Sequence, residues 1–239
     1  MRLSPLAPVA LLLFFSGPSF AQEWITYVSR ADMFSVNFPN QPKVQDITYI
    51  SELEAKFPAR VYTAEEGPSR YSMTVVDYTD SVRIHTERAK TCNPDAHDGC
   101  AGTGEEGAQG VGSYKYERRG APDFASWKIL LRDAKVSYFG WAVIDRIEGR
   151  YIHLTNADKS RSFFGIYMHG NRLYITEATV PAGYPEPGLF QQSLRMLDKE
   201  GRGVRYETIY TDGFPAPPRA GGGRGGGGGG GRGGNAPGN

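Results

Sequence analysis

Three absences limit the kinds of protein that this sequence can encode. Basic side chains number 27 and acidic ones 26 among 239 residues, so the formal net charge of +1 gives no overall bias toward nucleic acid or anionic lipid. The sequence contains neither a G-x-S-x-G nucleophile elbow nor an H-E-x-x-H zinc motif. Beyond the N-terminus, no stretch is long and apolar enough to span a bilayer. These patterns do not favour a nucleic-acid-binding protein, a common hydrolase or a membrane protein.

The N-terminus has the organisation of a secretory signal peptide. Arg2 precedes an apolar run from Leu6 to Phe15, and small residues at Ser19 and Ala21 follow at the spacing of a cleavage site. A membrane anchor needs about 20 apolar residues, which this run does not reach. We therefore predict that residues 1–21 are removed. The mature protein is expected to be exported, periplasmic or secreted, with no membrane span.

The C-terminus, residues 214–239, is rich in proline, glycine and arginine. Glycine loses much conformational entropy on ordering and has no side chain to bury, so this tail is predicted to be disordered. Its three arginines (Arg219, Arg224 and Arg232) favour polyanion binding as a weak alternative function. Because so few charges give a weak, easily screened interaction, no specific nucleic-acid partner is expected.

Residues 22–213 are long enough for one domain with its own hydrophobic core. The hydrophobic pattern predicts strands near residues 34–38, 61–64, 71–78, 136–147, 151–155, 162–168, 173–180 and 204–210. It predicts helices near residues 80–90, 122–132 and 187–198 and a long surface loop at 92–112. Turn residues at 148–149, 156–158 and 169–171 favour an antiparallel meander. The predicted fold class is α+β, with an antiparallel β-sheet covered by helices.

Several short motifs resemble those of PsbP-like domains, which belong to the Mog1/PsbP α/β/α sandwiches. They are the opening Trp24 and Tyr27, the segment F-S-V-x-F-P-x-x-P from Phe34 to Pro42, and the segment from Gly188 to Asp198. A group of exported bacterial proteins is also similar, through stretches such as residues 123–128 and 171–185. The resemblance implies a domain that serves in binding or scaffolding, with no family-wide catalytic residues to carry over.

Both cysteines lie in one short polar segment, Cys92 to Cys100, together with Asp95, His97 and Asp98. The C-x7-C spacing with one histidine matches no common zinc pattern, and the two aspartates lack the ligand ladder of a calcium loop. Two cysteines in an exported chain are most simply bonded to each other, so we predict a Cys92–Cys100 disulfide. A metal site at Asp95, His97 and Asp98, or a reactive thiol, is the alternative.

The remaining candidates for catalysis are isolated histidines. A periplasmic hydrolase or metal-dependent enzyme could use His97, His153 or His169, and a trio of Ser162, His153 and Asp145 can be assembled on paper. Almost any chain of this length offers such a trio, so the sequence favours a protein that is not an enzyme and needs no cofactor.

Aromatic residues crowd the predicted meander and its exit. Alternation places Tyr138 and Ala142 on one sheet face and Phe139 and Trp141 on the other. Apolar residues on both faces predict that both are covered. An uncovered aromatic surface would instead bind a ligand or protein, and its candidate residues are Trp141, Tyr167, Tyr174 and Tyr184. The predicted function is non-catalytic binding of a protein or cell-envelope component, through this surface or the 92–112 loop.

Overall fold

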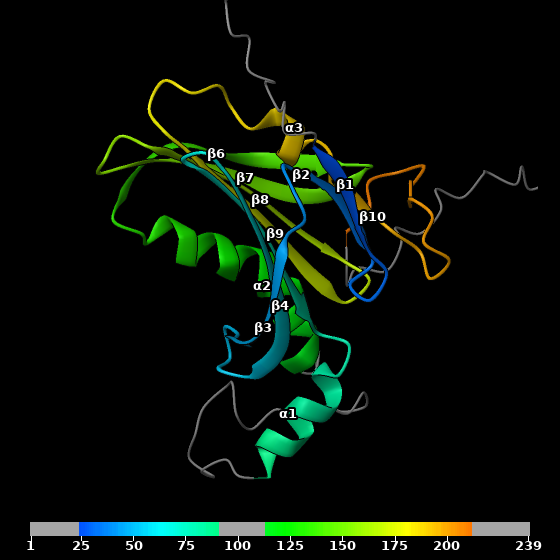
Figure 1. The fold of residues 1–239 in the computed structure, drawn as a ribbon. Helices are drawn as coiled ribbons and strands as arrows, with labels where there is room; N and C mark the ends of the chain where they lie inside the picture. Colours follow the sequence, from blue (N-terminus) through cyan, green and yellow to red (C-terminus); the bar gives the residue numbers. More distant parts are fainter. Residues whose placement is uncertain (1–23, 91–112, 212–239) are drawn as a thin grey trace, which may run out of the picture.

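A seven-stranded antiparallel sheet forms the centre of the computed structural model, which describes residues 24–90 and 113–211 (Figure 1). In sheet order, the strands are β3 (Lys43–Ile50), β4 (Lys56–Glu66), β5 (Ser69–Asp77), β9 (Arg172–Val180), β8 (Arg161–His169), β7 (Ile147–Asn156) and β6 (Ala134–Ile144). Strands β6 to β9 are neighbours in the order of the predicted meander. Strands β3 and β6 are the two edges of the sheet.

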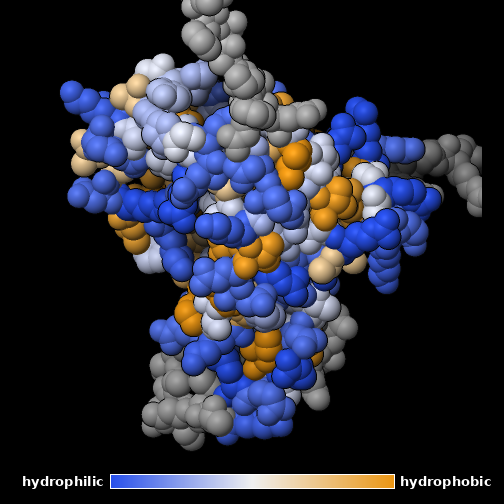
Figure 2. Space-filling view, viewed as in Figure 1, coloured by the Kyte–Doolittle hydropathy of each residue, from blue (hydrophilic) through white to orange (hydrophobic). Residues whose placement is uncertain are grey.

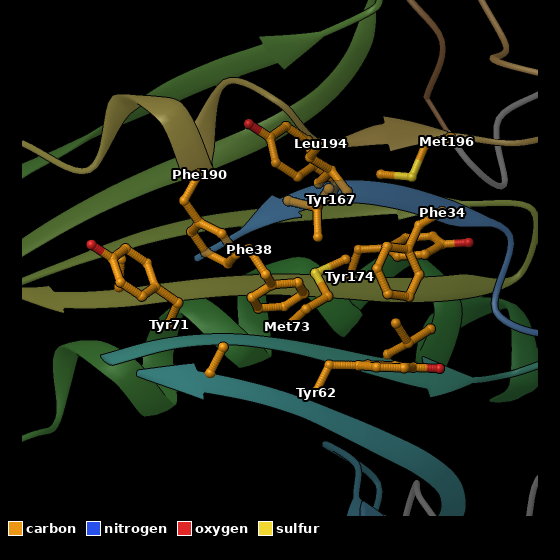
Figure 3. Packing of buried hydrophobic residues seen from close by; sticks show 14 of the residues in the cluster. Phe34, Phe38, Tyr62, Tyr71, Met73, Tyr167, Tyr174, Phe190, Leu194 and Met196 are labelled. Carbon is orange, nitrogen blue, oxygen red and sulfur yellow. The ribbon is translucent and has the colours of Figure 1, made fainter. Parts of the chain in front are cut away.

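A small second sheet covers one face of the large one. It consists of β1 (Ile25–Ser29), β2 (Phe34–Phe38) and β10 (Arg195–Met196), with β2 in the middle. Alternation in β2 directs Phe34, Val36 and Phe38 into the core, where they are fully buried. They pack against Tyr62, Tyr71, Met73 and Tyr174 of the large sheet and against Phe190, which belongs to the short helix α3 (Gly188–Gln191) (Figure 3).

Two helices, α1 (Ser81–Ala89) and α2 (Ser113–Leu130), cover the opposite face. Helix α2 buries Ala121, Ala125 and Ile129 in a core cluster that also contains Ile152 of β7 and Phe164 of β8. The predicted α+β class with an antiparallel sheet is therefore confirmed. Helices cover one face, whereas the second cover is mainly a β-sheet.

The predicted helix at residues 187–198 is wrong beyond its first turn. Helix α3 ends at Gln191, and the chain then extends into β10, which pairs with β2 through Arg195–Ser35 and Met196–Phe34. The Ser193 hydroxyl donates to the Phe190 carbonyl oxygen and accepts a hydrogen bond from the backbone N–H of Asn37. Pairing with a strand about 160 positions earlier in the chain thus overrides a local helical pattern.

Other boundaries also differ from the predictions. Within the expected strand at 204–210, only Tyr210 makes an isolated bridge, to Ile147, and the bridge Leu197–Gly203 lies just before it. Strand β3, which is mostly exposed, was not predicted because it lacks a clear apolar alternation. Helix α2 begins well before the expected residue 122 and contains Pro122.

The turn between β6 and β7 lies at Asp145–Arg146, and not at the predicted Glu148–Gly149. Both turn residues have positive φ, 48° and 67°, as a type I′ turn requires. The expected signal peptide, the 92–112 loop and the C-terminal tail lie outside the described residues. In the described ranges, no helix is long and apolar enough to cross a membrane.

Candidate binding surface

The four aromatic residues predicted to bind a partner are divided between surface and core. Trp141 is 56% exposed and Tyr184 is 46% exposed. Tyr167 and Tyr174 are buried, where no partner reaches them, and the Tyr174 hydroxyl donates to the Asp32 carbonyl oxygen at 2.9 Å. The alternation of the sequence does not reveal this division, because it cannot show which strand lies at an edge.

Strand β6 exposes large apolar side chains on both faces. Phe139 and Trp141 are each more than half exposed on the helix face, Tyr138 is 47% exposed on the other, and Val143 is partly exposed. The expectation that both faces are covered is therefore wrong for the helix face of this strand and for Tyr138, whereas Ala142 on the other face is buried in the core. By contrast, the face shown in Figure 2 carries hydrophobic residues as separate patches among hydrophilic ones.

The backbone of β6 also presents hydrogen-bonding groups at the edge. The two-residue turn makes Ile144 and Ile147 a hydrogen-bonded pair. Non-hydrogen-bonded and hydrogen-bonded pairs then alternate along the hairpin. The N–H and C=O groups of Phe139, Trp141 and Val143 therefore point away from β7. Glu148, the residue opposite Val143, supports this alternation. Its backbone N–H points away from β6 and donates to the carbonyl oxygen of Tyr210.

The side chain of Trp141 lies near the carboxylate of Glu148 on the neighbouring strand. The carboxylate of Glu148 accepts hydrogen bonds from Thr211 and Arg150, and Trp141 lies close enough to help lower its pKa. Burial acts to raise the pKa of Glu148, but these hydrogen bonds outweigh it and lower the pKa below its ordinary value.

Helix α2 and the residue that follows it contribute a second row of exposed apolar residues. Asp123 of α2 pairs with Arg150, the residue opposite Trp141, so this side of the helix faces the β6 side of the sheet. Trp127 and Leu131 follow Asp123 at intervals of four residues and are both more than half exposed. We call Trp127, Leu131, Phe139, Trp141 and Val143 the β6–α2 surface. An apolar centre with charged groups beside it is typical of protein-binding sites.

A smaller aromatic group lies on the other face of the sheet edge. The His153 ring packs between Tyr138 and Phe163, with ring centroids 5.0 and 4.7 Å away. Arg161 lies over the Phe163 ring and donates to the Tyr184 carbonyl oxygen. Burial lowers the pKa of His153, and the positive charge of Arg161 adds to this effect against the opposing carboxylate of Glu186. Neutral His153 therefore acts here as a packed aromatic side chain.

The other sites predicted for catalysis or metal binding do not come together among the described residues. His169 is buried and its Nε2 lies 2.8 Å from the Tyr206 hydroxyl. The Ser162 hydroxyl is 2.8 Å from that of Thr179, and it accepts a hydrogen bond from Asn156. Within residues 24–90 and 113–211, no group of three or more His, Cys, Asp or Glu side chains is arranged to hold a metal ion. Cys92, Asp95, His97, Asp98 and Cys100 lie outside these ranges.

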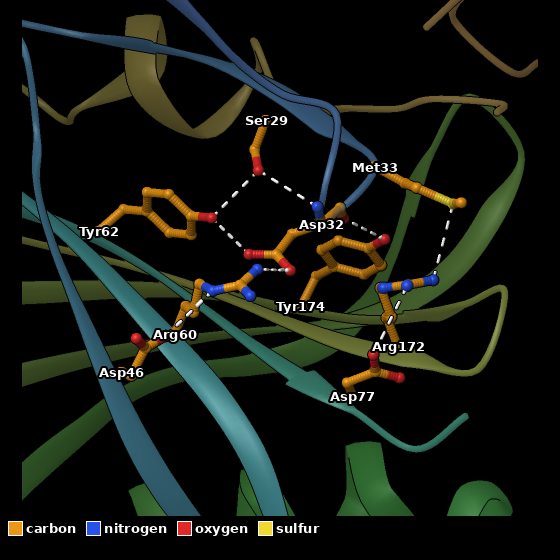
Figure 4. Close-up of polar contacts among 9 residues, drawn as sticks. All are labelled: Ser29, Asp32, Met33, Asp46, Arg60, Tyr62, Asp77, Arg172 and Tyr174. Carbon is orange, nitrogen blue, oxygen red and sulfur yellow. Dashed lines mark hydrogen bonds and ion pairs between the residues drawn. The ribbon is translucent and has the colours of Figure 1, made fainter. Parts of the chain in front are cut away.

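A buried polar network fixes the turn between β1 and β2 to the large sheet (Figure 4). The carboxylate of Asp32 accepts hydrogen bonds from Arg60, at 2.7 Å, and from the Tyr62 hydroxyl. Ser29 is 3.0 Å from the same hydroxyl and accepts a hydrogen bond from the backbone N–H of Asp32. Because both carboxylate oxygens are occupied by partners from the chain, this network is structural.

A second polar cluster lies between the helices and the sheet. Glu117 of α2 accepts hydrogen bonds from the Ser51 hydroxyl, at 2.6 Å, and from the Leu53 backbone N–H. His85 of α1 places its Nε2 3.6 Å from the same carboxylate oxygen. Burial is the main cause that lowers the pKa of His85 to about 4 and raises the pKa of Glu117.

Four polar atoms of this cluster have no hydrogen-bond partner among the described residues: Tyr49 Oη, Tyr78 Oη, His85 Nε2 and Glu117 Oε2. Burial raises the pKa of Tyr49 to about 12. Unpaired buried polar atoms cost about 1–3 kcal/mol each. This cluster is therefore a costly part of the interior.

Comparison with known proteins finds similarity among solved structures but none to a family model or a curated protein. The solution structure of cyanobacterial PsbP (CyanoP) from Synechocystis sp. PCC 6803 is similar at a TM-score of 0.37 and 12% sequence identity, covering 77% of this chain and 98% of that chain. The neighbour carries the family name that the sequence motifs suggested. At this TM-score and identity, neither family membership nor function follows from the similarity.

Proposed function

We propose that this chain is an exported, non-catalytic binding domain that recognises a protein or cell-envelope component through the β6–α2 surface. The observation that carries the proposal is the β6 edge, where outward-facing backbone groups and exposed apolar side chains belong to the same residues, Phe139, Trp141 and Val143. An extended partner segment would add a strand there, and the side chains would supply specificity. Export rests on the pattern of residues 1–21.

Site-specific photocrosslinking in the producing cell tests this proposal. A benzophenone amino acid at Phe139 is expected to give discrete adducts, and the same residue at Val44 is not. Val44 is a matched control, because it is exposed to a similar degree on β3, the opposite edge of the sheet. Trp141→Ala should abolish the Phe139 adducts. Equal adducts from both edges, or none from Phe139, would show that β6 is not a binding site.

A further inference from the structure

The β6 edge can pair with an identical strand. Edge strands usually avoid such pairing through charges, prolines or bulges. In β6, the irregularity lies between Val136 and Tyr138, and Lys135 before it is the charged residue of the strand. The segment from Tyr138 to Ile144 contains none of these protective features. It is regularly paired with β7 on one side, and no strand within residues 24–90 and 113–211 pairs with it on the other.

We propose that two copies of this chain associate through antiparallel pairing of their β6 strands around a two-fold axis at Trp141. This inference rests on the proposed function, because it names the partner of the same edge. The register pairs Phe139 with Val143 of the second copy and Trp141 with its symmetry mate. All outward N–H and C=O groups of these three residues then find partners, which registers centred on Gly140 or Ala142 do not achieve.

The side chains and the charges of β6 suit this arrangement. Phe139, Trp141 and Val143 all lie on the helix face, so each aromatic ring meets an apolar side chain of the other copy across the new strand pair. Lys135 precedes the paired segment and Asp145 follows it at the turn. Antiparallel association places the Lys135 end of each copy beside the Asp145 turn of the other, so opposite charges meet twice.

Sedimentation velocity of the full mature chain over a range of concentrations tests the association. The unmodified protein and the Val44→Lys control, altered on the opposite edge, are expected to dimerise. Trp141→Lys places two positive charges on the axis and should raise the dissociation constant by at least ~10-fold. Circular dichroism checks that the variants fold, which is expected because Trp141 is exposed. A monomer at every concentration, or a dimer indifferent to Trp141→Lys, overturns the proposal.

Zero-length carbodiimide coupling tests the register independently. Mixed unlabelled and ¹⁵N-labelled protein should give a Lys135–Asp145 crosslink that joins one peptide of each isotope. Its absence from a crosslinked dimer rules out this register. If the protein is monomeric while Phe139 still gives adducts with a different protein, self-association is wrong and the proposed function stands. Adducts between Phe139 and another part of the same chain would contradict both.

Discussion

The guanidinium of Arg60 lies 2.7 Å from the carboxylate of Asp32, and this contact joins strand β4 to the turn that follows β1. Arg60 also pairs with Asp46 on β3, at 3.0 Å. The Asp32 side chain is nearly buried, whereas that of Asp46 is exposed. Hydrogen bonding to Asp32 is the largest cause of the raised pKa of Arg60. The same guanidinium therefore makes one buried and one exposed ion pair, which gives a controlled comparison.

We predict that Asp32→Asn destabilises the domain by about 2 kcal/mol, because it weakens buried hydrogen bonds to Arg60 and Tyr62. Asp46→Asn, which removes the exposed pair, should change the free energy of unfolding by less than about 0.5 kcal/mol. Urea denaturation of both variants measures the difference. Similar losses in the two variants would show that burial does not govern the strength of this network.

His85 should make the stability depend on pH. Its folded pKa of about 4 lies below the ordinary value of 6.5, so the fold favours the neutral ring. The stabilising contribution is complete above pH 6.5 and is lost as the pH falls from 6.5 toward 4. A shift of this size corresponds to about 3 kcal/mol. Denaturation measured at several pH values should give a steep loss in this window.

The variant His85→Gln should flatten that loss, since glutamine does not titrate. His153→Gln is the comparison, because the pKa of His153 is also lowered but its side chain is less buried. An unchanged pH profile in His85→Gln would contradict the assignment of the loss to His85.

Gly149 allows β7 and β8 to pack closely. A Cβ at this position would overlap the carbonyl oxygen of Ile166 and the ring of Tyr167. We predict that Gly149→Ala destabilises the domain by about 3 kcal/mol, because the backbone oxygen cannot move aside. Gly203→Ala is the control, since a Cβ there meets nothing within 4 Å. Thermal unfolding of both variants measures the difference. Equal melting temperatures would refute the close packing of Gly149 as the cause of the loss.

The disulfide and the processing site remain predictions that one mass measurement tests. Protein purified from the exported fraction without reductant should begin at Gln22 and be about 2 Da lighter than its reduced form, as a Cys92–Cys100 bond requires. A native mass that includes a metal ion, together with free thiols, would support the alternative site at Asp95, His97 and Asp98.

The sequence predicted elements well where local pattern and burial agree. In β2, strict alternation of Phe34, Val36 and Phe38 corresponds to side chains that are all fully buried. Residues 187–198 failed because a helical pattern gives no information about pairing with a distant strand. Helix α2 buries the small residues Ala121 and Ala125 and exposes Trp127, so side-chain size alone points to the wrong face.

The candidate surface was only partly predictable for a similar reason. Trp141 was identified from aromatic content, but Tyr167 and Tyr174 share that content and lie in the core. Exposure depends on the order of strands in the sheet, which alternation does not encode. The turn at Asp145–Arg146, which sets the direction of the β6 backbone groups, lacks the glycine that usually marks it.

The position of β2 between β1 and β10 also sets the order in which the domain can be completed. Phe34 pairs with Met196, and Phe38 packs against Phe190 with ring centroids 5.2 Å apart. During synthesis from the N-terminus, the apolar side of β2 has no final cover until about 160 further residues have been added. Contacts of such long sequence separation form slowly. The small sheet can therefore close only late in synthesis, after α3 and β10 have been added.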